Sequence, residues 1–102
     1  MGSMPMPAPK SSGAAPAPTG ANAVNIDNFA FAPATLTVPV GATVTWTNHD
    51  EEPHNVVAEG GQFRSPTMGS GATFTYTFST PGTFAYVCGI HPMMHGTVVV
   101  TP

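Results

Sequence analysis

The residues between positions 88 and 95 carry the most metal-binding chemistry in the sequence. They read CGIHPMMH and hold a thiol, two imidazoles and two thioethers. Cys88, His91 and Met94 follow one another at intervals of three residues, so a turn in the chain can bring their side chains to one point. Thiolate, imidazole and thioether are all ligands of soft or borderline metals. The segment therefore predicts a metal site on a short loop.

A fourth ligand must come from another part of the chain, and His54 is the candidate. It lies in the stretch PHNV at 53–56, where another strand is expected to begin. A thiolate and a thioether together favour copper, and two His with one Cys and a long axial Met form the type 1 copper arrangement. Zinc is the competitor, but its structural sites prefer four strong ligands and the Met94 thioether is a weak one. The sequence favours copper over zinc.

The elements that must position these residues are short β-strands. Turn signals recur between positions 31 and 82, and apolar and polar residues alternate over 43–47 and 73–78. No segment has the helical period. The expected strands span residues 24–31, 35–38, 43–47, 54–58, 73–78, 83–88 and 96–101. This pattern predicts an all-β protein with a two-sheet antiparallel sandwich, in which Trp46 belongs to the core.

Composition excludes several classes of function. Charged residues make up 7% of the 102 residues. Lys and Arg together number two and Asp and Glu together number five, which gives a net charge of −3. Too few cations are present to follow a phosphate backbone, so no nucleic-acid partner is expected. The chain lacks the roughly 18 consecutive apolar residues of a transmembrane helix. A single cysteine excludes an intramolecular disulfide.

Residues 1–20 differ in composition from the rest of the chain. They are mostly Pro, Ala, Ser, Gly and Met, without an aromatic residue. Such a segment cannot bury enough surface to offset the entropy of ordering it. We therefore expect a flexible Pro/Ala-rich tail over 1–20, whose residues 1–3 resemble a cloning remnant, and one folded domain over 21–102.

Residues 24–101 resemble the cupredoxins, or type 1 blue copper proteins. They are most similar to the amicyanins and more distantly similar to plastocyanins and pseudoazurins. The matching stretches are VGATVTW at 40–46, PHNV at 53–56, PGTFAYVC at 81–88, the spacing Cys-x2-His-x2-Met from Cys88, and GTVVV at 96–100. Two positions depart from the family, because Met93 stands where an aromatic residue is usual and His95 where a cation is usual.

The resemblance implies a Greek-key sandwich of seven or eight strands that holds one type 1 copper ion. By this resemblance His54, Cys88 and His91 are the strong ligands and Met94 is the axial one. Asn55 is expected to tie the ligand strand to the Cys88 loop by hydrogen bonds. The remaining histidines are less defined: His95 is expected to be a solvent or docking residue, with a ligand role as the alternative.

The function implied is that of a small soluble electron-transfer protein, not an enzyme. Its expected partners are redox proteins, a cytochrome or an oxidoreductase. The expected docking surface lies around His91 and is formed by Pro53, Ile90, Pro92 and Met93. The protein is expected to be monomeric and periplasmic or secreted, with its signal sequence removed. The alternative is copper handling by a carrier, buffer or sensor that uses the same site, which Met4, Met6, Met93 and His95 support.

The residues 49–52, His-Asp-Glu-Glu, precede the His54 segment. We expect His49 to be a surface residue. The acidic run 50–52 is expected to be a solvated turn, and the alternative is a patch that steers a basic partner toward the site.

Overall fold

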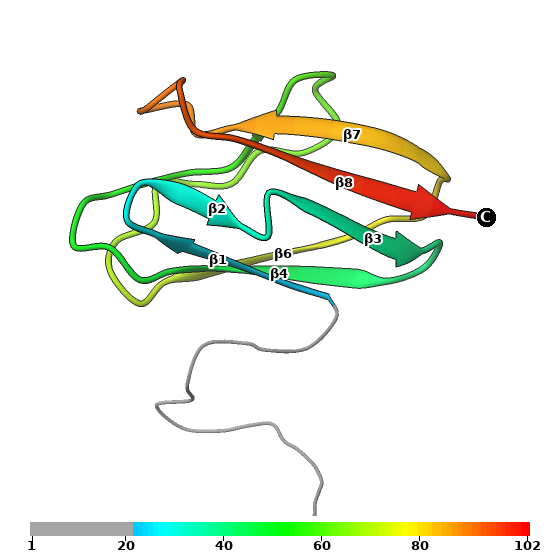
Figure 1. Ribbon diagram of the computed structural model, residues 1–102, viewed down its shortest axis with the longest axis horizontal. Coiled ribbons are helices and arrows are strands. Elements are labelled where there is room, and N and C mark those ends of the chain that lie inside the picture. Colours follow the sequence, from blue (N-terminus) through cyan, green and yellow to red (C-terminus); the bar gives the residue numbers. More distant parts are fainter. Residues whose placement is uncertain (1–21) are drawn as a thin grey trace, which may run out of the picture.

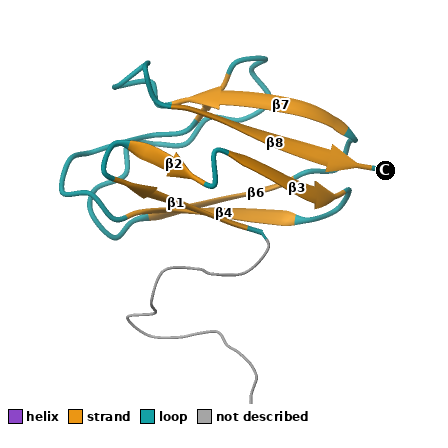
Figure 2. Cartoon of the chain, viewed as in Figure 1, coloured by secondary structure: helices purple, strands orange, loops and turns teal. Residues whose placement is uncertain are grey.

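The computed structural model describes residues 22–102, which form a β-sandwich (Figure 1). Within this part of the chain strands and loops alternate and no helix occurs (Figure 2), so none is present that could cross a membrane. The strands are β1 (Ala23–Asp27), β2 (Ala30–Ala32), β3 (Thr35–Pro39), β4 (Thr43–Asn48), β5 (Val57–Ala58), β6 (Thr73–Thr77), β7 (Gly82–Val87) and β8 (His95–Thr101). The expected tail over 1–20 lies outside the described residues.

The strands form two sheets of four, in the orders β2-β1-β4-β6 and β3-β8-β7-β5. This confirms the sandwich that the alternating pattern predicts. The sheets are mixed, however, because β1 runs parallel to β4 and β3 runs parallel to β8. Alternation reports which face of a strand is buried, but it carries no information about the direction of the neighbouring strand. The antiparallel expectation therefore holds only for the other pairs.

The expected strand over 24–31 is a hairpin of β1 and β2. Asn28 and Phe29 form its two-residue turn, with φ angles of 53° and 58°. Two consecutive positive φ angles are typical of the tight turn that suits the twist of a hairpin. Asn enters this conformation readily, whereas an aromatic side chain does so rarely, and so the sequence around Phe29 reads as a continuous strand.

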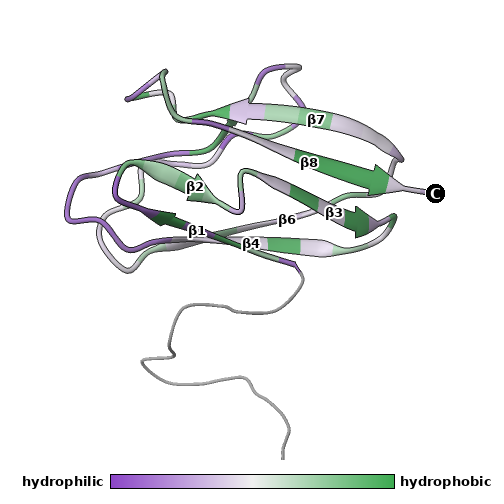
Figure 3. Ribbon diagram, viewed as in Figure 1, coloured by the Kyte–Doolittle hydropathy of each residue, from purple (hydrophilic) through white to green (hydrophobic). Residues whose placement is uncertain are grey.

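The core lies between the two sheets and is centred on Trp46. This side chain is fully buried and contacts the rings of Phe63, Phe74, Phe78 and Tyr86, with centroid separations of 5.5–6.5 Å. Hydrophobic residues are concentrated along the strands, most visibly β8 and β3, while the turns are more hydrophilic (Figure 3). The prediction that Trp46 is a core residue is confirmed.

Gly96 in β8 allows the closest approach of backbone to this core. A Cβ atom added there would overlap two ring carbons and the hydroxyl oxygen of Tyr86. We therefore expect Gly96→Ala to lower the free energy of unfolding by about 1–3 kcal/mol through overpacking. The matched control is Gly69→Ala, because a Cβ at Gly69 meets nothing within 4 Å. Thermal unfolding measures the difference, and equal melting temperatures for the two variants would contradict it.

Burial raises the pKa of Tyr86 from 10.0 to about 12. Between these values an unfolded chain loses the phenolic proton while the folded chain keeps it, so stability is complete below pH 10 and falls as the pH rises. We expect a loss of about 1.4 kcal/mol per pH unit over this window. Denaturant unfolding at pH 9 and pH 11 tests this against Tyr86→Phe, which removes the group. An equal pH dependence in both proteins would contradict the assignment.

Candidate metal centre

The hairpin of β7 and β8 positions two of the predicted ligands. Its pairing ends with Val87 opposite His95, so Cys88 and Met94 lie directly beyond the last pair. The Cys88 N–H donates to the Met94 carbonyl at 3.1 Å, and the Met94 N–H donates to the His91 carbonyl at 2.9 Å. The loop over 88–94 is thus closed by its own backbone at one end of the sandwich (Figure 1).

His54 reaches the same place from a different part of the chain. It lies outside the strands, since β5 covers only Val57–Ala58 of the strand expected over 54–58. Instead, His54 and Met68 exchange backbone hydrogen bonds of 3.1 and 2.8 Å in an isolated bridge. The imidazole is fully buried. The backbone bridge therefore holds a polar side chain in the interior next to the Cys88 loop.

Three of the predicted ligands converge. The Cys88 Sγ atom lies 3.7 Å from Nδ1 of His54 and 3.8 Å from Nδ1 of His91. All three donor atoms lie within 4.8 Å of one another, and this is the one such group found in residues 22–102. Ligand atoms at about 2.0 Å (nitrogen) and 2.3 Å (sulfur) from a metal are about 3.7 Å apart at trigonal angles. The three side chains fit a single metal ion.

Met94 and His95 have different surroundings although they are adjacent. Met94 is 2% exposed and its backbone is bonded to both Cys88 and His91, so the residue lies buried beside the three donors. The side chain of His95 is 65% exposed, and its Nδ1 lies 4.0 Å from a carboxylate oxygen of Glu59. His95 thus lies in solvent, as expected, and its docking role stays a prediction.

Asn55 connects the His54 segment to the Cys88 loop, as expected. Its Oδ1 atom accepts a hydrogen bond of 2.6 Å from the Gly89 N–H and lies 3.8 Å from the Cys88 sulfur. Contacts of this kind orient metal ligands and adjust the electron density on a thiolate. The amide thus restrains the loop next to the sulfur.

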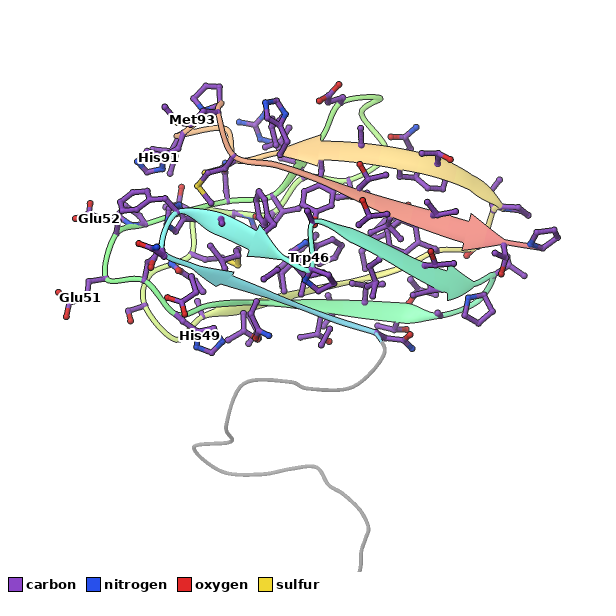
Figure 4. The ribbon with its side chains drawn as sticks, in the orientation of Figure 1. Trp46, His49, Glu51, Glu52, His91 and Met93 are labelled. Carbon is purple, nitrogen blue, oxygen red and sulfur yellow. The ribbon has the colours of Figure 1, made fainter. Side chains whose placement is uncertain are left out.

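Asp50 contacts the site, which sequence reasoning missed. Its Oδ2 atom lies 2.9 Å from Nε2 of His54, and its side chain is only 11% exposed. Burial raises the pKa of this carboxyl, but hydrogen bonds from the Phe29 and Asn28 N–H groups and from His54 outweigh burial, so the pKa lies below its ordinary value. Of the expected solvated turn, only Glu51 and Glu52 are exposed (Figure 4). The signal available in the sequence was a carboxylate four residues before a candidate ligand.

His49 is a surface residue, as expected. Its imidazole is exposed, and Nε2 lies 2.9 Å from Oδ1 of Asn25 on β1. In Figure 4 it lies away from His91 and Met93. It takes no part in the cluster of donors.

An exposed apolar surface surrounds His91. The exposed large hydrophobic residues next to it are Phe29, Ile90 and Met93, of which Met93 is 76% exposed. The Phe29 ring stands edge-on to the rings of His54 and His91, at centroid separations of 5.3 and 5.2 Å. His91 itself is half-buried and lies near Met93 (Figure 4). Phe29 was not among the expected docking residues, because the hairpin turn that brings it here was read as a strand.

Comparisons with known proteins agree with this geometry. Residues 6–100 match the family of the cupredoxin-like domain. Amicyanin-alpha of Methylorubrum extorquens is 37% identical over 82 residues, covering 76% of this chain and 69% of its own length. Plastocyanin of Scenedesmus fuscus is 32% identical over 83 residues, covering 69% of this chain and 85% of its own length. The amicyanin matches span 62–69% of those proteins' own lengths.

One solved structure shares the fold over nearly all of its own length. The structure described as a novel purple cupredoxin from Nitrosopumilus maritimus superposes with a TM-score of 0.72 at 33% identity, covering 78% of this chain and 98% of its own. The donors of His54, Cys88 and His91 all lie within the residues that match the family. Their chemistry suits one type 1 copper ion. The chain belongs to the cupredoxin family.

Proposed function

We propose that this cupredoxin is a small electron-transfer protein that carries single electrons on one type 1 copper ion, with His54, Cys88, His91 and Met94 as ligands. The observation that supports this most is the convergence of one thiol and two imidazoles within 4.8 Å at the end of the sandwich. The bound copper supplies a one-electron couple. Uptake of the metal requires the Cys88 thiolate, so it releases the thiol proton.

The surrounding residues keep the ligands in place. Cys88 and His54 are fully buried, and backbone bonds to Met94 and Met68 restrain them. Pro53 precedes His54 and Pro92 follows His91, so each proline fixes one φ angle beside a histidine ligand. A site that moves little between oxidation states needs little reorganisation to pass an electron. Rigid, buried ligands therefore suit electron transfer.

The half-buried His91 offers the route by which electrons enter and leave. Its exposed neighbours Ile90, Met93 and Phe29, together with Pro53 and Pro92, form the proposed docking surface for a redox partner, a cytochrome or an oxidoreductase. An apolar surface with few charges suits the weak and transient contact that a carrier needs. The protein acts as a monomer and not as an enzyme, and one metal-binding group in residues 22–102 suits a carrier.

We also propose how the chain is organised and where it works. Residues 21–102 form the cupredoxin domain and 1–20 a tail. The protein works in the periplasm or is secreted, as the likeness to amicyanins suggests. The described residues contain no membrane-spanning helix.

Copper handling is the second candidate. It is favoured by the exposure of Met93 and His95, a thioether and an imidazole that lie beside the proposed ligands and could pass copper to a partner. The other two residues that support it, Met4 and Met6, lie outside the described residues. Tight Cu(I) binding combined with slow electron exchange would favour this function.

Addition of Cu(II) to the metal-free protein tests the site. We expect an intense visible band from thiolate-to-copper charge transfer and a narrow EPR hyperfine splitting, because the sulfur lies with both imidazoles around one point. Cys88→Ala is the control and should lose the band entirely. A pale Cu(II) spectrum in the wild-type protein, or a band that persists in Cys88→Ala, would contradict the type 1 assignment.

Electron self-exchange tests the docking surface. Two molecules exchange electrons fastest when their His91 surfaces meet, so Met93→Glu should slow exchange about tenfold at low ionic strength by placing like charges face to face. NMR line broadening in mixtures of the two oxidation states gives the rate. The visible spectrum should not change, since Met93 is exposed.

The matched control for Met93→Glu is Val40→Glu. Val40 is also exposed, but its N–H bonds to the Thr101 carbonyl at the far end of β8 from the metal centre. Both variants add one negative charge, so a loss of rate that is equal in both would assign the effect to net charge and remove the docking surface.

A further inference from the structure

The Asp50 carboxylate accepts hydrogen bonds from two separate parts of the protein. Its Oδ1 accepts from the Asn28 N–H at 2.7 Å, and its Oδ2 accepts from the Phe29 N–H at 2.9 Å. The same Oδ2 lies 2.9 Å from Nε2 of His54. One side chain thus joins the β1–β2 turn to a candidate metal ligand.

The contact between Asp50 and His54 determines which ring nitrogen of His54 carries no proton. An ionised carboxylate can only accept hydrogen bonds, so Nε2 of His54 must carry the proton that it donates to Asp50. In the neutral imidazole Nδ1 is then the bare nitrogen. It is this nitrogen that faces the Cys88 sulfur at 3.7 Å. Asp50 therefore selects the tautomer that a metal requires.

The hydrogen bonds between Asp50 and the Asn28–Phe29 turn stabilise an unfavourable backbone conformation. Phe29 has a φ of 58°, a region that a side chain with a Cβ enters at a steric cost and an aromatic residue enters rarely. Consecutive N–H groups that converge in a turn form a binding site for an anion, and here the anion is the Asp50 carboxylate. These two hydrogen bonds offset the cost of the turn.

The Asn28–Phe29 turn places the Phe29 ring against both candidate histidines. The Phe29 ring lies edge-on to His54 at 5.3 Å and to His91 at 5.2 Å between centroids, at interplanar angles of 86° and 87°. Nearly half of its surface remains exposed, so burial in the core does not explain its position. A strained residue held beside a functional centre is more consistent with a role at that centre than with fold stability alone.

We propose that Asp50 is a positioning residue that acts on both candidate histidines of the metal centre. It binds Nε2 of His54 directly and sets the tautomer of that ring. It also clamps the Asn28–Phe29 turn, so that the Phe29 ring restrains the rings of His54 and His91. The inference rests on these histidines as proposed ligands, and it does not depend on electron transfer.

NMR of the metal-free protein tests the proposal. In the wild type at pH 8, the imidazole ¹⁵N shifts of His54 should show a protonated Nε2 and a bare Nδ1. In Asp50→Ala this preference should be lost, because the acceptor that holds the Nε2 proton is removed. The Asn28 and Phe29 amide protons should exchange at least about tenfold faster, since charge-assisted hydrogen bonds are lost. The NOEs between the Phe29 and His91 rings should weaken.

Two control variants separate this role from simpler explanations. Glu51→Gln removes the same charge from the next, exposed residue and should leave all three NMR readouts unchanged. Phe29→Ala removes the ring but leaves the carboxylate, so the His54 tautomer should stay as in the wild type. Both controls are also measured without metal, so the result is independent of copper loading and of the proposed function.

Several results would overturn the proposal. A bare Nε2 in wild-type His54 would overturn it without any variant, which also covers the case that Asp50→Ala does not fold. Identical readouts in Asp50→Ala and Glu51→Gln would show that the carboxylate positions nothing. A change in only the tautomer or only the turn would overturn the coupling, because one carboxylate must hold both. Loss of the tautomer in Phe29→Ala would assign the role to the ring.

Discussion

The antiparallel pairing of β7 with β8 is the interaction on which the metal centre depends. It runs to the pair Val87 and His95, and it therefore places Cys88 and Met94 side by side where the loop begins and ends. The hydrogen bond from Met94 to the His91 carbonyl then turns the loop so that His91 faces the sulfur. A change of register by one residue would direct Cys88 to the other face of the sheet, away from His54.

The second requirement is that the buried polar side chains of the His54 segment and of Asn48 are hydrogen-bonded. His54, Asn55 and Asn48 are buried, and each is bonded to a neighbouring segment. The Asn48 amide donates to the carbonyls of Glu52 and Met68, while its Oδ1 accepts from the Asp50 N–H. This network fixes the loop that carries both Asp50 and His54. The rigidity expected of an electron carrier thus arises from hydrogen bonds as much as from packing.

Much of the fold and of the candidate site could be predicted from local patterns. The alternation around Trp46 identified a buried face, and the spacing of Cys88, His91 and Met94 identified the loop. The same patterns could not report the parallel pairs β1–β4 and β3–β8, because alternation is blind to strand direction. They also missed the hairpin at Asn28 and Phe29, since the conformation of this turn contradicts the preference of an aromatic residue.

The sequence by itself determined the chemistry of the protein: the kinds of donor atom, the three-residue spacing that lets one loop supply them, and through these the cupredoxin family. These are local properties, and they follow from side-chain type and chain geometry. Only the tertiary structure decided which carboxylate and which aromatic ring accompany the donors. Asp50 meets Asn28 and Phe29 across 22 and 21 residues of chain, and Cys88 meets His54 across 34. Such contacts form because sheet pairing brings distant segments together, which no local pattern records.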